Sequence, residues 1–182
     1  MKRLCPLLVF LLCLLLSGCG SSAAAERFES FSRELTEREE LRFTAQLRAE
    51  YPDKTLDFTL QYALRGGEQT VTVVQPEQIA GIRARIAADA TTLEYDDLIL
   101  DTGDLDGAGL TPMSALPLLV ETLRSAHPDS AWEEAGEMAV QLIRDDHLSA
   151  TVRFTPEDMR PTHAELISDG RVTASIDISD WR

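Results

Sequence analysis

The sequence predicts an α+β domain in which a curved antiparallel sheet, a half-open β-barrel, is covered on its concave side by helices. Three observations predict this fold class. Several stretches alternate apolar and polar side chains, as strands with one dry face do. Two other stretches repeat apolar residues at helical spacing. The sequence contains neither an internal repeat nor a second domain boundary, so we expect a single domain over residues 26–182.

The first 18 residues are expected to be a signal peptide rather than part of the fold. Lys2 and Arg3 give a cationic start, and residues 4–16 are almost wholly apolar. This apolar run has the length of a signal-peptide core. It is shorter than the roughly 20 residues that a membrane-spanning helix needs.

The motif Leu16-Ser17-Gly18-Cys19 directly follows the apolar run. It resembles the bacterial lipobox, which implies that Cys19 receives lipid and that signal peptidase II cuts before it. Leu16, Ser17 and Gly18 would then be the recognition residues. An ordinary signal peptide or a buried cysteine is the alternative.

Residues 20–25 are small or polar, so we expect residues 19–25 to be a lipidated cysteine with a flexible tether. The expected location is extracytoplasmic. Fatty acyl chains such as palmitate on Cys19 would anchor the chain to the membrane. In a host with two membranes, Gly20 lacks the aspartate signal for inner-membrane retention, which favours the outer membrane. A host with one membrane is equally compatible with the sequence.

The charge and the cysteines exclude several classes of function. The net charge is −14, and no run of Lys and Arg stands in the sequence, so a nucleic-acid partner is not expected. Electrostatic adhesion to an anionic membrane is not expected either. The cysteines are Cys5, Cys13 and Cys19, so processing would leave no pair for a disulfide and no thiol for a redox or zinc site.

The first half of the domain is expected to be one helix followed by strands. Residues 26–38 place Phe28, Phe31 and Leu35 on one helical face. Alternation of apolar and polar residues then predicts the strands, and Gly66-Gly67 marks a hairpin. The predicted strands are residues 41–51, 56–65, 70–75, 79–87, 92–95 and 98–101.

The second half begins with an Asp- and Gly-rich loop over residues 101–110 and a helix over 111–126 that ends near His127. Pro112 suits the first turn of this helix. Asp169-Gly170 predicts a hairpin turn before the last strand. The predicted strands are residues 138–144, 148–154, 162–167 and 171–178.

This layout resembles the LolA/LolB superfamily, which includes mycobacterial lipid-carrying lipoproteins and a germination lipoprotein of spore-forming clostridia. The resemblance rests on the strands over 41–51 and 56–64, the helical insertion over 111–126, and the hairpin over 162–178 that Pro161 precedes. It covers most of residues 26–182. It implies a LolA-like half-open barrel that takes acyl chains, without enzymatic activity, metal or cofactor.

The apolar face of the sheet is therefore either a lipid-binding cavity or an ordinary core. The first alternative predicts a lipoprotein that binds or carries an acyl lipid or the lipid moiety of a lipoprotein. The second predicts a structural scaffold that docks an envelope protein, for example in sporulation or germination. Small residues on this face (Ala45, Ala49, Ala84 and Ala174) suit either a cavity or close helix packing. The expected cavity lining is Phe43, Leu47, Phe58, Leu60, Tyr62, Val152 and Ile176.

Other candidate chemistry is weaker. A calcium loop aligned on Asp104 and Asp106 would have Thr102 and Met113 where acidic ligands are needed. The histidines have no partner at ligand spacing, and no serine stands in a nucleophile elbow. Trp132 and Trp181 are expected to be packing anchors. We therefore expect no enzyme.

Overall fold

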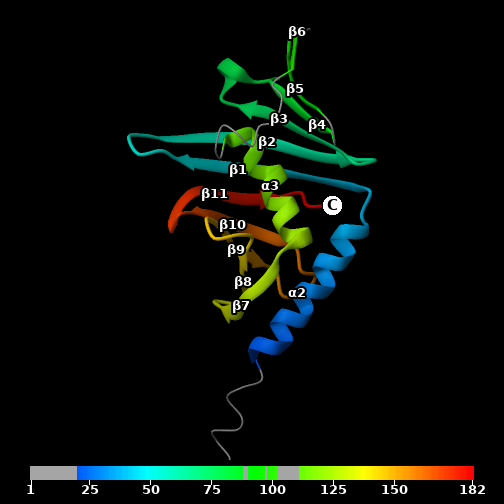
Figure 1. The fold of residues 1–182 in the computed structure, drawn as a ribbon, viewed down its shortest axis with the longest axis vertical. Helices are drawn as coiled ribbons and strands as arrows, with labels where there is room; N and C mark the ends of the chain where they lie inside the picture. The colour runs from blue at the N-terminus through cyan, green and yellow to red at the C-terminus, as the bar shows by residue number, and fades with distance from the viewer. Residues whose placement is uncertain (1–19, 88–89, 97, 102–110) are drawn as a thin grey trace, which may run out of the picture.

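The computed structural model describes residues 20–87, 90–96, 98–101 and 111–182. The expected signal peptide, the expected lipobox with Cys19, and residues 102–110 of the Asp- and Gly-rich loop lie outside these residues. Eleven strands form one antiparallel sheet in the order β6-β5-β4-β3-β2-β1-β11-β10-β9-β8-β7, with two helices across it (Figure 1). The predicted fold class, a curved and unclosed antiparallel sheet covered by helices, is confirmed.

The elements follow the chain in a simple order. The first helix and six strands are α2 (Gly20–Glu37), β1 (Glu40–Glu50), β2 (Thr55–Arg65), β3 (Glu68–Gln75), β4 (Arg83–Ala87), β5 (Ala90–Tyr95) and β6 (Leu98–Asp101). The rest are α3 (Pro112–Ser125), β7 (His127–Glu134), β8 (Glu137–Ile143), β9 (Leu148–Phe154), β10 (Pro161–Ser168) and β11 (Arg171–Ser179). Since β6 and β7 are the two edges, the sheet does not close.

Strand β1 lies at the centre of the sheet and explains its two faces. Its odd-numbered residues from Leu41 to Ala49 are buried, whereas its even-numbered residues point outward. Leu47 lies opposite Phe58 on β2 and opposite Ile176 on β11. Alternation with a period of two therefore places the apolar side chains under the helices and the polar ones on the outer face.

Helix α2 packs its apolar face against the half of the sheet that includes β7 and β8. Phe28, Phe31 and Leu35 are buried, as their helical spacing predicts. The helix begins at Gly20, whereas the sequence led us to expect a tether up to residue 25. Ala24, within that segment, is buried, so the helical face extends further toward the N-terminus than predicted.

A row of aromatic rings joins α2 to the centre of the sheet. Phe31 lies 6.4 Å from Trp181, measured between ring centroids. Trp181 stacks on Phe43 at 5.0 Å, and Phe43 stacks on Tyr62 at 4.8 Å. The buried Tyr62 hydroxyl donates a hydrogen bond to Gln69 at 2.9 Å. Aromatic pairs at these separations stabilise by about 0.5–1.5 kcal/mol beyond the area that they bury.

Helix α3 lies across the sheet beside α2 (Figure 1). Thr111 and Ser114 form a capping box at its start, with Pro112 in the first turn as predicted. Its last turn is tied to α2, because Arg124 donates hydrogen bonds to the carbonyls of Leu35 and Arg38 at 3.2 and 3.0 Å. The buried apolar face of α3 consists of Ala115, Leu116, Leu119, Val120 and Leu123.

Strand β7 is the element that the sequence analysis did not predict. It follows α3 directly and pairs with β8 through a turn at Ala135 and Gly136, both with positive φ. An alanine is uncommon at the first of these positions, where Asn, Asp or Gly is usual, so the turn carried no recognisable signal. The hairpins at Gly66-Gly67 and Asp169-Gly170 have such residues, and both predictions are confirmed.

The predicted strand over residues 79–87 is shorter in the structure. A 3-10 turn occupies Glu77–Ile79, and β4 begins only at Arg83. Gly81, with a φ of 90°, redirects the chain between them. The apolar residue Ile79 therefore belongs to a turn that precedes the strand.

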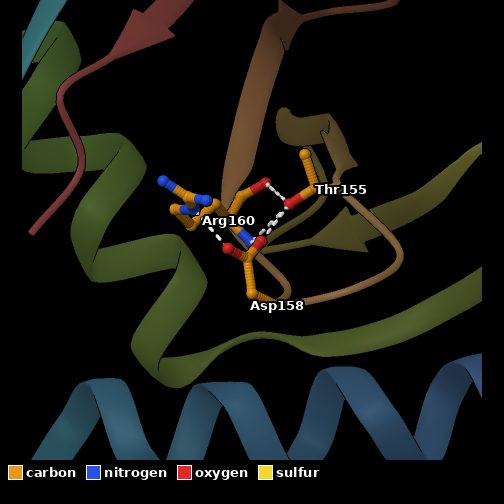
Figure 2. A network of polar contacts seen from close by, with 3 residues as sticks. All are labelled: Thr155, Asp158 and Arg160. Carbon is orange, nitrogen blue, oxygen red and sulfur yellow. Dashed lines mark hydrogen bonds and ion pairs between the residues drawn. The ribbon is translucent and has the colours of Figure 1, made fainter.

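A polar network shapes the turn between β9 and β10, close to α2 (Figure 2). Thr155 donates a hydrogen bond from its hydroxyl to Asp158 at 2.5 Å, and Arg160 forms an ion pair with the same carboxylate at 2.5 Å. These contacts, led by the Thr155 hydrogen bond, lower the pKa of Asp158 below its ordinary value. The network holds the turn in a position where Met159 and Trp181 line a shared hollow with α2.

The two tryptophans provide a matched pair for testing this packing. Trp181 is 8% exposed, as expected of a packing anchor, whereas Trp132 on the edge strand β7 is 37% exposed and is not one. We expect Trp181→Ala to lower the free energy of unfolding by about 3–5 kcal/mol, because it leaves a void between Phe31 and Phe43. Trp132→Ala should cost about 1 kcal/mol or less. Urea unfolding followed by circular dichroism measures both, and equal losses would contradict the aromatic row as a determinant of stability.

Candidate functional site

A small cavity lies on the concave side of the sheet, where the N-terminal end of α3 meets β1 and β11. Its volume is about 210 Å³. Apolar residues from three elements dominate its wall. They are Leu47, Ala49, Tyr51, Pro112, Ala115 and Ala174.

Three alanines explain why this space exists. Ala49 on β1 lies directly opposite Ala174 on β11. Ala115, in the first turns of α3, lines the same space. Each of the three is buried, and each supplies only a methyl group where its strand or helix neighbours supply larger side chains. The gap is therefore built from small residues on facing elements.

The sequence analysis singled out two of these alanines, Ala49 and Ala174, as compatible with a cavity. Ala45 and Ala84, in the same set, are fully buried in the core and do not line it. Ala115 was not singled out, because on a helix a small residue gives no sign of what it faces. For Ala49 and Ala174 the missing information was their cross-strand pairing.

Most of the residues predicted to line a cavity lie within a continuous hydrophobic core. Phe58 is half-buried and packs against that core. Leu47 also lines the 210 Å³ cavity, whereas the others do not. The buried members of the set are Phe43, Leu47, Leu60, Tyr62, Val152 and Ile176. The structure thus brings the seven residues together on the concave side, and side chains of α2, α3 and the sheet fill much of the space between them.

Polar residues from several elements also line the cavity. They are Glu50, Thr111, Ser168 and Thr173. Thr173 donates its hydroxyl hydrogen bond to the carbonyl of Leu166 at 3.1 Å, so that hydroxyl is satisfied within the sheet. The cavity therefore has a mostly apolar wall with some polar groups, the arrangement of a site for an amphipathic molecule.

Burial of Tyr62 has an electrostatic consequence. Loss of solvation raises the pKa of its phenol well above the ordinary value, despite an opposing effect of Arg124. The phenol is therefore neutral and serves as a hydrogen-bond donor to Gln69.

The histidines lie apart from the cavity and apart from one another. His163 pairs with Asp177 at 2.7 Å, and His147 pairs with Asp169 at 2.8 Å. Within the described residues, no group of three or more His, Cys, Asp or Glu side chains is placed to hold a metal ion.

Among the helices that the structure describes, none is both long enough and apolar enough to cross a membrane.

Comparison with known proteins gives structural similarity alone. No family model and no curated protein sequence matches the chain. An uncharacterized conserved protein from Thermus thermophilus is similar with a TM-score of 0.52 at 11% identity, over 87% of this chain and 86% of that one. A DUF1329 family protein from Desulfovibrio piger has a TM-score of 0.51 at 9% identity, over 88% and 92%.

The structural neighbours also include a LolA superfamily protein from Nitrosomonas europaea, with a TM-score of 0.47 at 11% identity over 85% of this chain and 92% of that one. At these identities the likeness concerns the fold.

The pair formed by His147 and Asp169 predicts a measurable pH dependence. Their hydrogen bond, together with the negative charge of Asp169, raises the pKa of His147 above its ordinary value of 6.5. The contribution of the pair to the stability of the fold is therefore fully present below pH 6.5. It is lost as the pH rises through the raised pKa of His147. Nuclear magnetic resonance titration should find a pKa above 6.5 for His147 and a lower value in Asp169→Asn. An unchanged pKa in that variant would contradict the pairing.

Proposed function

We propose that this chain is a membrane-anchored lipoprotein that binds a hydrophobic ligand, an acyl lipid or the lipid moiety of another lipoprotein, in the bacterial cell envelope. Its role is binding rather than catalysis. The observation that carries the proposal is the cavity of about 210 Å³ on the concave side of the sheet, whose mostly apolar lining includes three alanines. The lipobox-like motif ending at Cys19 supports the anchor.

The cavity has room for part of an acyl chain. Apolar cavities of about 150 Å³ bind ligands of the size of benzene, whereas sites for drug-sized ligands measure roughly 300–1,000 Å³. A cavity of about 210 Å³ therefore accepts a short stretch of hydrocarbon. Burying each methylene group would contribute about 0.8 kcal/mol.

A longer chain would require α3 to shift at one end. The last turn of α3 is held to the end of α2. Arg124 donates to the carbonyls of Leu35 and Arg38, and its own carbonyl accepts from the hydroxyl of Ser32 at 3.2 Å. The first turn, with Pro112 and Ala115, forms a wall of the cavity instead. We infer that the N-terminal end of α3 moves outward to admit a longer chain while the other end stays in place.

The second candidate function is a scaffold that docks another envelope protein. It is favoured by the dense packing of the concave side, where six of the seven residues predicted to line a cavity are buried in the core. A scaffold needs no internal ligand. The acidic surface, with a net charge of −14, would then contact a basic partner, and salt would weaken the complex.

Filling the cavity distinguishes these functions. Ala174→Leu places a larger side chain in the cavity opposite Ala49, and the existing space limits the cost of overpacking. We expect native mass spectrometry of residues 20–182 to show a bound fatty acid or phospholipid, and we expect the variant to lose at least tenfold in uptake. Ala87→Leu, at an exposed position on β4 outside the cavity, is the control and should bind as the parent does. A bare mass that persists after incubation with lipids would favour the scaffold.

The anchor requires a separate test. In a bacterial host, labelled palmitate should enter the parent chain but not Cys19→Ser, and the parent should fractionate with membranes. The variant should be released from membranes or retain its uncut precursor. Equal labelling of both chains would contradict lipidation at Cys19, whatever the cavity binds.

A further inference from the structure

The outer face of the sheet carries a groove that neither the anchor nor the cavity explains. Its volume is about 530 Å³. It runs over the start of β1, the end of β2, the first half of β3 and the start of β4. Four arginines line it, and we call it the arginine groove. They are Arg42, Arg65, Arg83 and Arg182.

Strand pairing brings these arginines together from distant parts of the sequence. Arg42 and Arg182 lie side by side, because each backbone N–H donates to the other's carbonyl, at 2.8 and 3.0 Å. Ala63 lies opposite Arg42 on β2 and lines the groove. Its methyl group leaves a depression between longer side chains. Since β1, β2 and β11 are consecutive in the sheet, the arginines converge although no two of them are close in the sequence.

Neutral hydrogen-bonding groups lie beside the arginines. One row across the sheet consists of Thr44, Gln61, Thr72 and Arg83, in register from β1 to β4. Arg83 donates to the hydroxyl of Thr72 at 3.4 Å. Hydroxyl and amide groups can donate to an anion without adding charge. The groove thus combines fixed positive charge with neutral donors.

The charges in the groove are only partly compensated. Two carboxylates, Glu68 and Asp180, line the groove together with the four arginines. Arg85 engages Glu68 at 3.6 Å, and Arg83 approaches Glu94 at 3.9 Å. In the part of the chain that the structure describes, Arg42, Arg65 and Arg182 make no ion pair. The whole sequence has 31 acidic and 17 basic residues, so surplus arginine charge is unexpected anywhere on its surface. Its concentration in a groove points to an external anion as the missing counter-charge.

We propose that the arginine groove binds a phosphate-bearing ligand. Guanidinium groups match phosphate oxygens in bidentate pairs, and several converging arginines suit a group with more than one negative charge. The volume lies within the range of small-molecule sites. An added peptide strand is disfavoured, because β1 and β2 each pair on both sides and have no free edge. Recognition must therefore come from side chains.

The phosphate has two sources of the same chemistry: a soluble phosphate ester and a phospholipid headgroup. The groove lies on the opposite face of the sheet from the cavity of about 210 Å³, so it does not depend on acyl binding there. The proposal thus stands or falls separately from the proposed function.

The test uses the full-length chain in dodecylmaltoside micelles and isothermal titration calorimetry. Inorganic pyrophosphate is the soluble probe, and micelles with added phosphatidylglycerol, against phosphatidylcholine, are the lipid probe. The variant Arg42→Gln/Arg65→Gln removes two charges from the groove. Arg33→Gln/Arg171→Gln removes the same charge from exposed arginines that make no ion pair within the described residues. Thermal unfolding confirms that both variants are folded.

We expect saturable binding of at least one phosphate probe, at least tenfold weaker in the groove variant and unchanged in the control, and weakened by salt. Binding of pyrophosphate identifies a soluble ester as the source, and binding of phosphatidylglycerol alone identifies a headgroup. Equal affinity in the groove and control variants, or no binding of either probe, would overturn the proposal. Titration with polyglutamate is the competing arm: binding of polyglutamate as tight as that of pyrophosphate would also overturn the proposal, because it would assign the groove to an acidic protein.

Discussion

The fold depends on covering one face of a sheet whose strands are apolar on that side only. The aromatic row from Phe31 through Trp181 and Phe43 to Tyr62 makes the connection, because it links α2, the C-terminal segment and the two central strands. Arg124 then ties the end of α3 to α2. The two helices are therefore fixed to the sheet and to each other near one end of α3, and the cavity of about 210 Å³ lies at the other end.

This difference between the two ends of α3 relates the core to the candidate site. Three alanines line the space under the start of α3, whereas the rings of Phe31, Trp181 and Phe43 contact one another in a row. A protein that only needed stability would gain by placing larger side chains there, since empty space forfeits contact energy. Binding of hydrocarbon would restore those contacts, which relates the small residues on the concave side to ligand uptake.

The long strands and both helices were predictable because their periodicity is unbroken over many residues, as β1 shows from Leu41 to Ala49. β7 was missed because its hairpin turns on Ala135, an uncommon residue at positive φ. The start of α2 was placed too late, because small residues such as Ala24 suit a tether and a buried helical face equally. Neither site was fully predictable: Ala49 meets Ala174, and Arg42 meets Arg182, only through strand pairing.

The early start of α2 has a consequence for how the domain is presented. With lipid on Cys19 as proposed, regular helix begins at the next residue and continues for 18 residues, about 27 Å, until it reaches β1. A helix packed against the sheet would then replace the expected flexible tether. The domain would therefore keep a fixed distance and a fixed tilt relative to the bilayer. In Figure 1 the β6 edge lies at the far end of the molecule from the start of α2. That edge, with its exposed Leu98, Ile99 and Leu100, would then face away from the lipid and toward whatever approaches from the envelope.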